Sequence, residues 1–256
     1  MSAIDFNRIE VLTFDTYGTL IDWERGILDA LQPILAAHDP DASDDELLER
    51  YASHEAEAER GIYRTYREVL AWSVRAVCAD LGVDPADQAV AEFAASVGAW
   101  PAFPDTAAAL RRLAGRYRLA VITNCDDDLF AQSNRRLGVH FDWVVTAQQA
   151  RRYKPRPEVF EFALARIGVP RERILHVAQS LYHDHVPAHA LGIGTAWINR
   201  RHGRPGFGAT PPATATPDLE VPDMRTFADV ALGEEARTPG QRIPGRGREP
   251  GAPPGA

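Results

Sequence analysis

The chain has 256 residues, 45% of them apolar and 25% charged, which suits a globular domain with a large insertion or two small domains. Its formal charge of -8 argues against nucleic acids or anionic membranes as partners, because both are bound by basic surfaces. Cys78 and Cys125 are too few for a disulfide framework or a zinc site. No apolar run is long enough to span a bilayer, and residues 1–10 lack a basic, apolar leader. We therefore expect a cytoplasmic protein that acts on a small molecule.

The first predicted element is a short apolar strand at 10–14, which ends at Asp15. Residues 22–98 then carry helical patterns and almost no strand pattern. Ser43 precedes an acidic run, which is typical of a helix N-cap. We expect an all-helical insertion over 22–98, after the first strand, with helices at 26–37, 44–59, 63–81 and 84–97.

After a Pro-rich break at 100–104, strands and helices alternate. This alternation predicts a doubly wound, Rossmann-like α/β core with a parallel sheet, built from 1–21 and 99–233. Residues 234–256 are rich in Pro, Gly and Arg and are expected to form a disordered tail. The expected strands of this part are 119–122, 143–145, 174–178 and 194–198, and the helices are 106–115, 127–137 and 157–167.

Polar residues directly follow the predicted strands, and in parallel sheets such residues meet at one edge. Each of them alone could be an ordinary cap or turn residue. The acidic run 126–128 lies at the start of a predicted helix and is best explained by capping and dipole compensation. The lone lysine among 28 basic residues, Lys154, lies in a loop before a helix. The other residues are Asp15, Tyr17 and Thr19 after the first strand, Thr123 and Asn124 after the second, and Gln179, Ser180 and Asp184 after the strand at 174–178.

Four short segments of the sequence resemble, in order, the four motifs of the haloacid dehalogenase superfamily. They are the segment 14–20, Thr123-Asn124, Lys154-Pro155, and Ser180 with Asp184. The resemblance covers roughly residues 9 to 200, and the first motif is its most specific part. It implies a catalytic role for the lone lysine and a cap domain for the helical insertion.

Two positions distinguish the activities of this superfamily. Its phosphatases have a second aspartate two residues after the first, and here Tyr17 stands there; a phenol with a pKa of about 10 is a poor acid at neutral pH. They also place a magnesium-binding acid before the fourth-motif serine, and here Gln179 stands there. The sequence is therefore similar to 2-haloacid dehalogenases, which implies no metal and no cofactor.

The resemblance implies a reaction in which Asp15 attacks the halogen-bearing carbon and forms an ester that water then hydrolyses. Lys154 would steady the charge and Asp184 would position the water. Thr123 and the backbone around Tyr17 would bind the substrate carboxylate, and Thr19 and Ser180 are the other implied substrate-binding residues of the core. Asn124 and a cap arginine would hold the halide. Motif spacing aligns this arginine to Arg50, although Arg60, Arg64 and Arg67 lie close enough in sequence to compete.

Departures from the family pattern keep alternatives open. Phe160 replaces a tyrosine and Leu181 an asparagine, so a magnesium-dependent phosphatase of small phosphoesters and an inert binding protein of the same fold stay as alternatives. The substrate is expected to be a small organic anion. Family members often pair, so a homodimer is left open.

Overall fold

The fold is built on a parallel sheet of six strands, in the order β3-β2-β1-β4-β5-β6. A computed structural model describes residues 4–36, 38 and 42–234. The central strands are fully buried, as expected of short apolar runs covered on both faces. The strands are β1 (Val11–Phe14), β2 (Arg118–Thr123), β3 (Trp143–Thr146), β4 (Ile174–Ala178), β5 (Gly194–Ile198) and β6 (Leu219–Val221).

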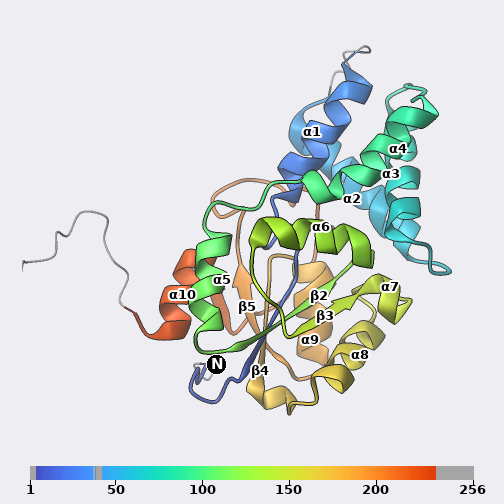
Figure 1. The fold of residues 1–256 in the computed structure, drawn as a ribbon. Helices are drawn as coiled ribbons and strands as arrows, with labels where there is room; N and C mark the ends of the chain where they lie inside the picture. Colours follow the sequence, from blue (N-terminus) through green and yellow to red (C-terminus); the bar gives the residue numbers. More distant parts are fainter. Residues whose placement is uncertain (1–3, 37, 39–41, 235–256) are drawn as a thin grey trace, which may run out of the picture.

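Helices cover both faces of the sheet, and alternate residues of each strand point to opposite faces. Leu12 and Phe14 of β1 join the core formed with α5 (Thr106–Ala114), α6 (Asp127–Leu137) and α10 (Met224–Leu232). Val11 faces a second core formed with α8 (Pro157–Ile167) and α9 (Val186–Ala190). The short helix α7 (Ala147–Ala150) follows β3 (Figure 1). The predicted doubly wound α/β fold is thus confirmed.

Four helices between β1 and α5 group together above the sheet (Figure 1). They are α1 (Trp23–Leu35), α2 (Asp44–Glu59), α3 (Tyr66–Asp80) and α4 (Asp87–Ala95), followed by a 3-10 turn at Ser96–Ala99. We call α1–α4 the helical segment. Because it follows β1, it lies beyond the carboxyl edge of the sheet, where the predicted site residues gather. Its predicted limits, 22–98, stay a prediction.

Local sequence explains where the helices of this segment begin. Ser43 caps α2 and Thr65 caps α3, and each forms a capping box with the glutamate three residues on, Glu46 or Glu68. Within the described residues, no helix is both long and apolar enough to cross a membrane.

The sequence patterns did not predict the strand β6 or the helices α7, α9 and α10. The core therefore has a sixth strand beyond the five expected, paired with β5. The predicted tail, 234–256, lies outside the described residues except for Glu234.

The interpretation of the acidic run 126–128 holds for two of its three residues. Asp127 and Asp128 lie in the first turn of α6, where acids offset the helix dipole. Asp126 precedes α6 but makes no side-chain cap to that helix. Its carboxylate instead accepts the backbone N–H groups of Tyr66 at 3.0 Å and Arg67 at 3.2 Å, at the start of α3. The aspartate therefore caps a helix sixty residues away in sequence and joins the helical segment to the core.

Candidate active site

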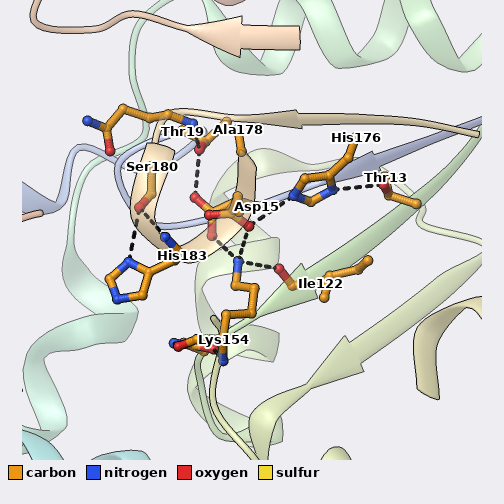
Figure 2. Close-up of polar contacts among 12 residues, drawn as sticks. Thr13, Asp15, Thr19, Ile122, Lys154, His176, Ala178, Ser180 and His183 are labelled. Atoms are coloured by element: carbon orange, nitrogen blue, oxygen red, sulfur yellow. Dashed lines mark hydrogen bonds and ion pairs between the residues drawn. The ribbon is translucent and has the colours of Figure 1, made fainter. Parts of the chain in front are cut away.

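Lys154 lies at the centre of the site, with an exposed fraction of only 1%. Its Nζ donates to Asp15 Oδ1 at 2.8 Å, to Asp184 Oδ1 at 2.6 Å and to the carbonyl oxygen of Ile122 at 2.9 Å (Figure 2). An ammonium group has three donors, so all are used. Burial alone would lower the pKa of Lys154, but the two carboxylates raise it above its ordinary value. The group therefore stays charged.

Asp15 leaves the end of β1 and is held on both oxygens. Thr19 Oγ1 donates to Asp15 Oδ2 at 2.6 Å and accepts the backbone N–H of Gln179 at 2.9 Å. Gly18 permits this turn, because its φ of +89° favours glycine and an added Cβ would lie 2.8 Å from Trp23 Nε1. Burial raises the pKa of the Asp15 carboxyl, and the adjoining ammonium acts in the opposite direction.

Asp184 is oriented from behind by a residue that sequence reasoning did not assign to the site. His176 Nε2 lies 2.9 Å from Asp184 Oδ1, and its Nδ1 lies 2.8 Å from Thr13 Oγ1 (Figure 2). Burial opposes ionisation of Asp184, yet Lys154 and His176 hold its pKa well below the usual value. Within the described residues its Oδ2 is buried without a hydrogen-bond partner, so it can accept from a water.

The two positions that distinguish the superfamily's activities, 17 and 179, present no carboxylate to Asp15. Tyr17 is buried, and its hydroxyl contacts Ser133 Oγ at 3.0 Å and Cys125 Sγ at 3.3 Å. Burial raises the pKa of Tyr17 well above 10, so its hydroxyl stays protonated. The side chain of Gln179 accepts from Thr210 Oγ1 at 3.2 Å and lines a neighbouring cleft.

Two glutamates of α2 complete the cavity from the side of the helical segment. Glu55 Oε1 accepts the hydroxyls of Tyr51 at 2.9 Å and Tyr66 at 2.8 Å, and all three are buried. Glu59 is also buried. Sequence reasoning missed both glutamates. Their four-residue spacing on the same helix face as Tyr51 was the available indication.

Asn124 contacts Glu59 instead of an open site. Its Oδ1 accepts the backbone N–H of Lys154 at 2.8 Å, and its Nδ2 donates to the carbonyl of Lys154 at 3.0 Å. These two bonds fix the orientation of the amide. The Nδ2 atom then lies 3.2 Å from each carboxyl oxygen of Glu59. Glu59 therefore occupies the face of Asn124 where the resemblance implied a halide.

The structure does not bring Arg50 to the cavity. Arg50 is exposed, and it lies on the opposite side of α2 from Glu59, because nine residues at about 100° each make two and a half turns. The other cap arginines that the sequence offered also lie outside the cavity: Arg60 and Arg64 are exposed, and Arg67 pairs with Asp128.

The remaining predicted residues differ in placement. Ser180 lines the cavity, where its Oγ accepts the backbone N–H of His183 at 2.9 Å. Thr123 is fully buried at the end of β2, outside the cavity lining, and its hydroxyl has no partner among the described residues. Phe160 packs edge-on against the His176 ring and takes no part in the cavity surface.

The cavity is small in this conformation. Its volume is about 20 Å³, which admits about one water molecule. A molecule larger than water therefore does not fit beside Asp15 in this conformation. Its lining consists of Asp15, Tyr17, Trp23, Glu55, Glu59, Tyr66, Asn124, Lys154, Ser180, His183 and Asp184.

Comparison with known proteins gives consistent matches. A family model described as haloacid dehalogenase-like hydrolase matches residues 9–182. Haloacetate dehalogenase H-2 of Moraxella sp. (strain B) is 30% identical over 85% of this chain and 95% of its own length. The 5-amino-6-(5-phospho-D-ribitylamino)uracil phosphatase YigB of Escherichia coli (strain K12) is 29% identical over 77% of this chain and 86% of its own.

The fold has a counterpart among solved structures. The L-2-haloacid dehalogenase from Xanthobacter autotrophicus with chloropropionic acid covalently bound superposes with a TM-score of 0.73. The match covers 88% of this chain and 99% of that one, at 20% identity. At this identity the likeness concerns the fold alone.

Proposed function

Because the chain belongs to the haloacid dehalogenase-like hydrolases, we propose that it hydrolyses the carbon–halogen bond of short 2-haloalkanoic acids through a covalent ester on Asp15. One observation carries the proposal. A single buried ammonium group, that of Lys154, bridges the carboxylate that would attack and the carboxylate that would hold the water.

In the first step, Asp15 attacks the carbon that bears the halogen, and halide leaves with the bonding electron pair. The carboxylate needs orientation more than activation, which Thr19 and Lys154 supply. In this step Lys154 acts through its positive charge, which offsets the negative charge of the substrate. Its three N–H donors are already held by acceptors of the protein.

In the second step, water attacks the carbonyl carbon of the ester and releases the hydroxy acid. The unpartnered Oδ2 of Asp184 is the acceptor that orients this water, while His176 and Lys154 hold Oδ1. The oxygen that came from Asp15 leaves as the hydroxyl of the hydroxy acid, and the oxygen of the water becomes part of the new Asp15 carboxylate. This carboxylate forms beside the ammonium group, which stabilises its charge.

Two observations weigh against the phosphatase alternative despite the phosphatase relative. The hydroxyl of Tyr17 is directed to Ser133 and Cys125, and the side chain of Gln179 is directed to Thr210. A magnesium-dependent phosphoryl transfer uses carboxylates at these two places, as the resemblance implies, and neither is present.

The deciding experiment measures halide release from 2-chloropropionate and phosphate release from small phosphoesters, side by side, with and without a chelator. Chelator-insensitive halide release supports the proposal. Phosphate release that requires magnesium contradicts it.

A single turnover with excess enzyme in ¹⁸O-water tests the covalent step. The first product should carry ordinary oxygen from Asp15, and Asp15 should gain the label. Asp15→Asn, checked by mass for deamidation, should lower turnover by at least about 10⁴-fold, whereas the exposed control Asp44→Asn should not. A product labelled in the first turnover would exclude the ester, and an absence of any turnover would favour the inert binding protein.

A further inference from the structure

The charge of the cavity is unusual for a site that takes an organic anion. Among the described residues that line it, Lys154 is the only one with an ammonium or guanidinium group. Four carboxyl groups face the same space, those of Asp15, Glu55, Glu59 and Asp184. If all four were ionised, the site would repel an anionic substrate, so the proposed function requires that some of them are protonated when substrate binds.

Glu59 is the carboxyl group best placed to keep its proton. It is buried, and Glu55 lies one turn earlier on the same helix. Burial and the neighbouring Glu55 raise the pKa of Glu59 well above its ordinary value, while Lys154 and Asn124 act in the opposite direction. By contrast, Lys154 holds Asp184 in its ionised form.

A neutral Glu59 has one O–H donor whose acceptor must lie in the cavity. The Nδ2 of Asn124 already donates to the carboxyl oxygens, so that amide cannot accept the proton. His183 Nε2 is 3.9 Å from Glu59 Oε2, beyond hydrogen-bond range, and has no partner among the described residues. The carboxyl group of Glu59 and the ring of His183 therefore face a space about one water in size. The resemblance implied the guanidinium group of a cap arginine there.

We propose that Glu59, as a neutral carboxyl group, donates the hydrogen bond that stabilises the departing halide, and that this donor favours fluoride over the heavier halides. The inference rests on the proposed function and specifies its leaving group. Fluoride is the smallest halide, so an O–H donor approaches its charge most closely and the Coulomb attraction is strongest.

The step balances without another reactant. A carboxylate oxygen of Asp15 forms a bond to carbon, the carbon–halogen bond breaks, and halide takes the bonding pair while Glu59 O–H points at it. Hydrolysis of the ester then consumes one water and yields the hydroxy acid, with the net proton released to solvent. Glu59 keeps or regains its proton before the next turnover.

A pH dependence at this site must be separated from that of its neighbours. Burial lowers the pKa of His183 to about 4, so it is neutral over the working range. Burial raises the pKa of Glu55 to about 7, which makes it the main competitor of Glu59. The ionisable groups around Glu59 are Tyr51 and Glu55 on α2, Tyr66 on α3, Tyr153 and Lys154 before α8, Asp15 after β1, and His183 and Asp184 after β4.

The test compares fluoroacetate, chloroacetate and bromoacetate, with kcat/KM measured by release of each halide between pH 5 and pH 10. Glu59→Leu removes the donor, and Glu59→Gln keeps a neutral donor that cannot ionise. Glu55→Gln reports on the competing group. Glu57→Gln, at an exposed position of the same helix, is the matched control. Thermal unfolding verifies that each variant is folded.

In the wild-type protein, fluoride release should fall at high pH as Glu59 loses its proton. Glu59→Gln should abolish this alkaline limb, whereas Glu55→Gln should retain it. Glu59→Leu should lower fluoride release on the order of 10²-fold more than bromide release, as loss of one directed donor to a developing anion does.

The outcomes separate the two levels of the argument. If the wild-type protein releases no halide from any of the three acids, the proposed function fails, and the inference fails with it. If halide is released but the ratio of kcat/KM for fluoroacetate to that for bromoacetate is the same in Glu59→Leu as in the wild type, only the inference fails. An alkaline limb that persists in Glu59→Gln and disappears in Glu55→Gln likewise overturns the role of Glu59.

Discussion

The Nε2 atom of His176 lies 2.9 Å from Oδ1 of Asp184, deep beneath the cavity. Since Nδ1 of the same ring contacts the hydroxyl of Thr13, both ring nitrogens are engaged, and the contacts fit when Nε2 donates to Asp184 and Thr13 donates to Nδ1. The contact engages Oδ1 and leaves Oδ2 of Asp184 without a hydrogen-bond partner among the described residues. His176 is thus a positioning residue, which acts through Asp184 and does not touch the substrate.

We predict that His176→Phe slows hydrolysis of the ester more than its formation. A hydrogen bond to a charged group is worth about 1.5–3 kcal/mol, so hydrolysis should slow about 10- to 100-fold. Rapid quenching followed by mass measurement of the protein should then reveal accumulated ester. The exposed His189→Phe serves as the control. Loss of ester formation itself, with no accumulation, would contradict a role confined to Asp184.

Lys154→Met should lose both activity and stability. Without the ammonium group, Asp15 and Asp184 face each other as buried carboxylates, which costs about 3–5 kcal/mol unless one of them takes a proton. Urea unfolding should therefore show a large loss for Lys154→Met and a partial recovery for Lys154→Met/Asp184→Asn. Arg152→Met is the exposed control in the same loop. Equal stabilities of the single and double variants would refute the charge argument.

The fold was largely predictable from sequence because its elements have strong local patterns. The structure confirms three helices at the predicted bounds, α2, α6 and α8, and the strands β4 and β5. The strand β6 has only three residues, which is too short for a periodic pattern, and its pairing with β5 holds it in the sheet.

The core half of the site was predictable for a topological reason. Asp15, Asn124 and Asp184 all follow strands that run parallel, so they meet at one edge regardless of loop detail. The half contributed by the helical segment depends on how α2 docks, which no local pattern specifies. This is why motif spacing points to Arg50 and does not identify Glu59, on the opposite side of the same helix.

Asp126 should control how firmly the helical segment is held on the core. Its carboxylate satisfies two backbone donors at the start of α3 and complements the positive end of that helix, so Asp126→Ala should cost about 1–2 kcal/mol. Hydrogen exchange should accelerate selectively at the amides of Tyr66 and Arg67. Asp127→Ala is the control, because the carboxylate of Asp127 accepts hydrogen bonds from the core residues Thr146 and Gln149. Faster exchange at Tyr66 in both variants would indicate a general loss of stability.

Glu55 should make the protein less stable as the pH rises from about 4.5 to about 7. Burial raises its pKa from 4.5 to about 7 in the folded state, so over this interval the folded chain holds a proton that the unfolded chain has released. The unfolded state binds fewer protons, and the free energy of unfolding therefore falls with increasing pH, by roughly 3 kcal/mol if Glu55 acts alone. Glu55→Gln mimics the protonated form, keeps an oxygen that accepts the hydroxyls of Tyr51 and Tyr66, and should remove most of this decline. Urea unfolding at pH 5 and pH 8 checks the prediction, with Glu57→Gln on the exposed face of α2 as the control.

Because burial also lowers the pKa of His183 to about 4, that residue contributes with the opposite sign: its stabilisation is present above about pH 6.5 and is lost towards pH 4. The comparison therefore uses the difference in the free energy of unfolding between Glu55→Gln and the wild type, in which the His183 contribution cancels. If the free energies of unfolding of the two proteins change in parallel with pH, Glu55 is ionised in the folded state.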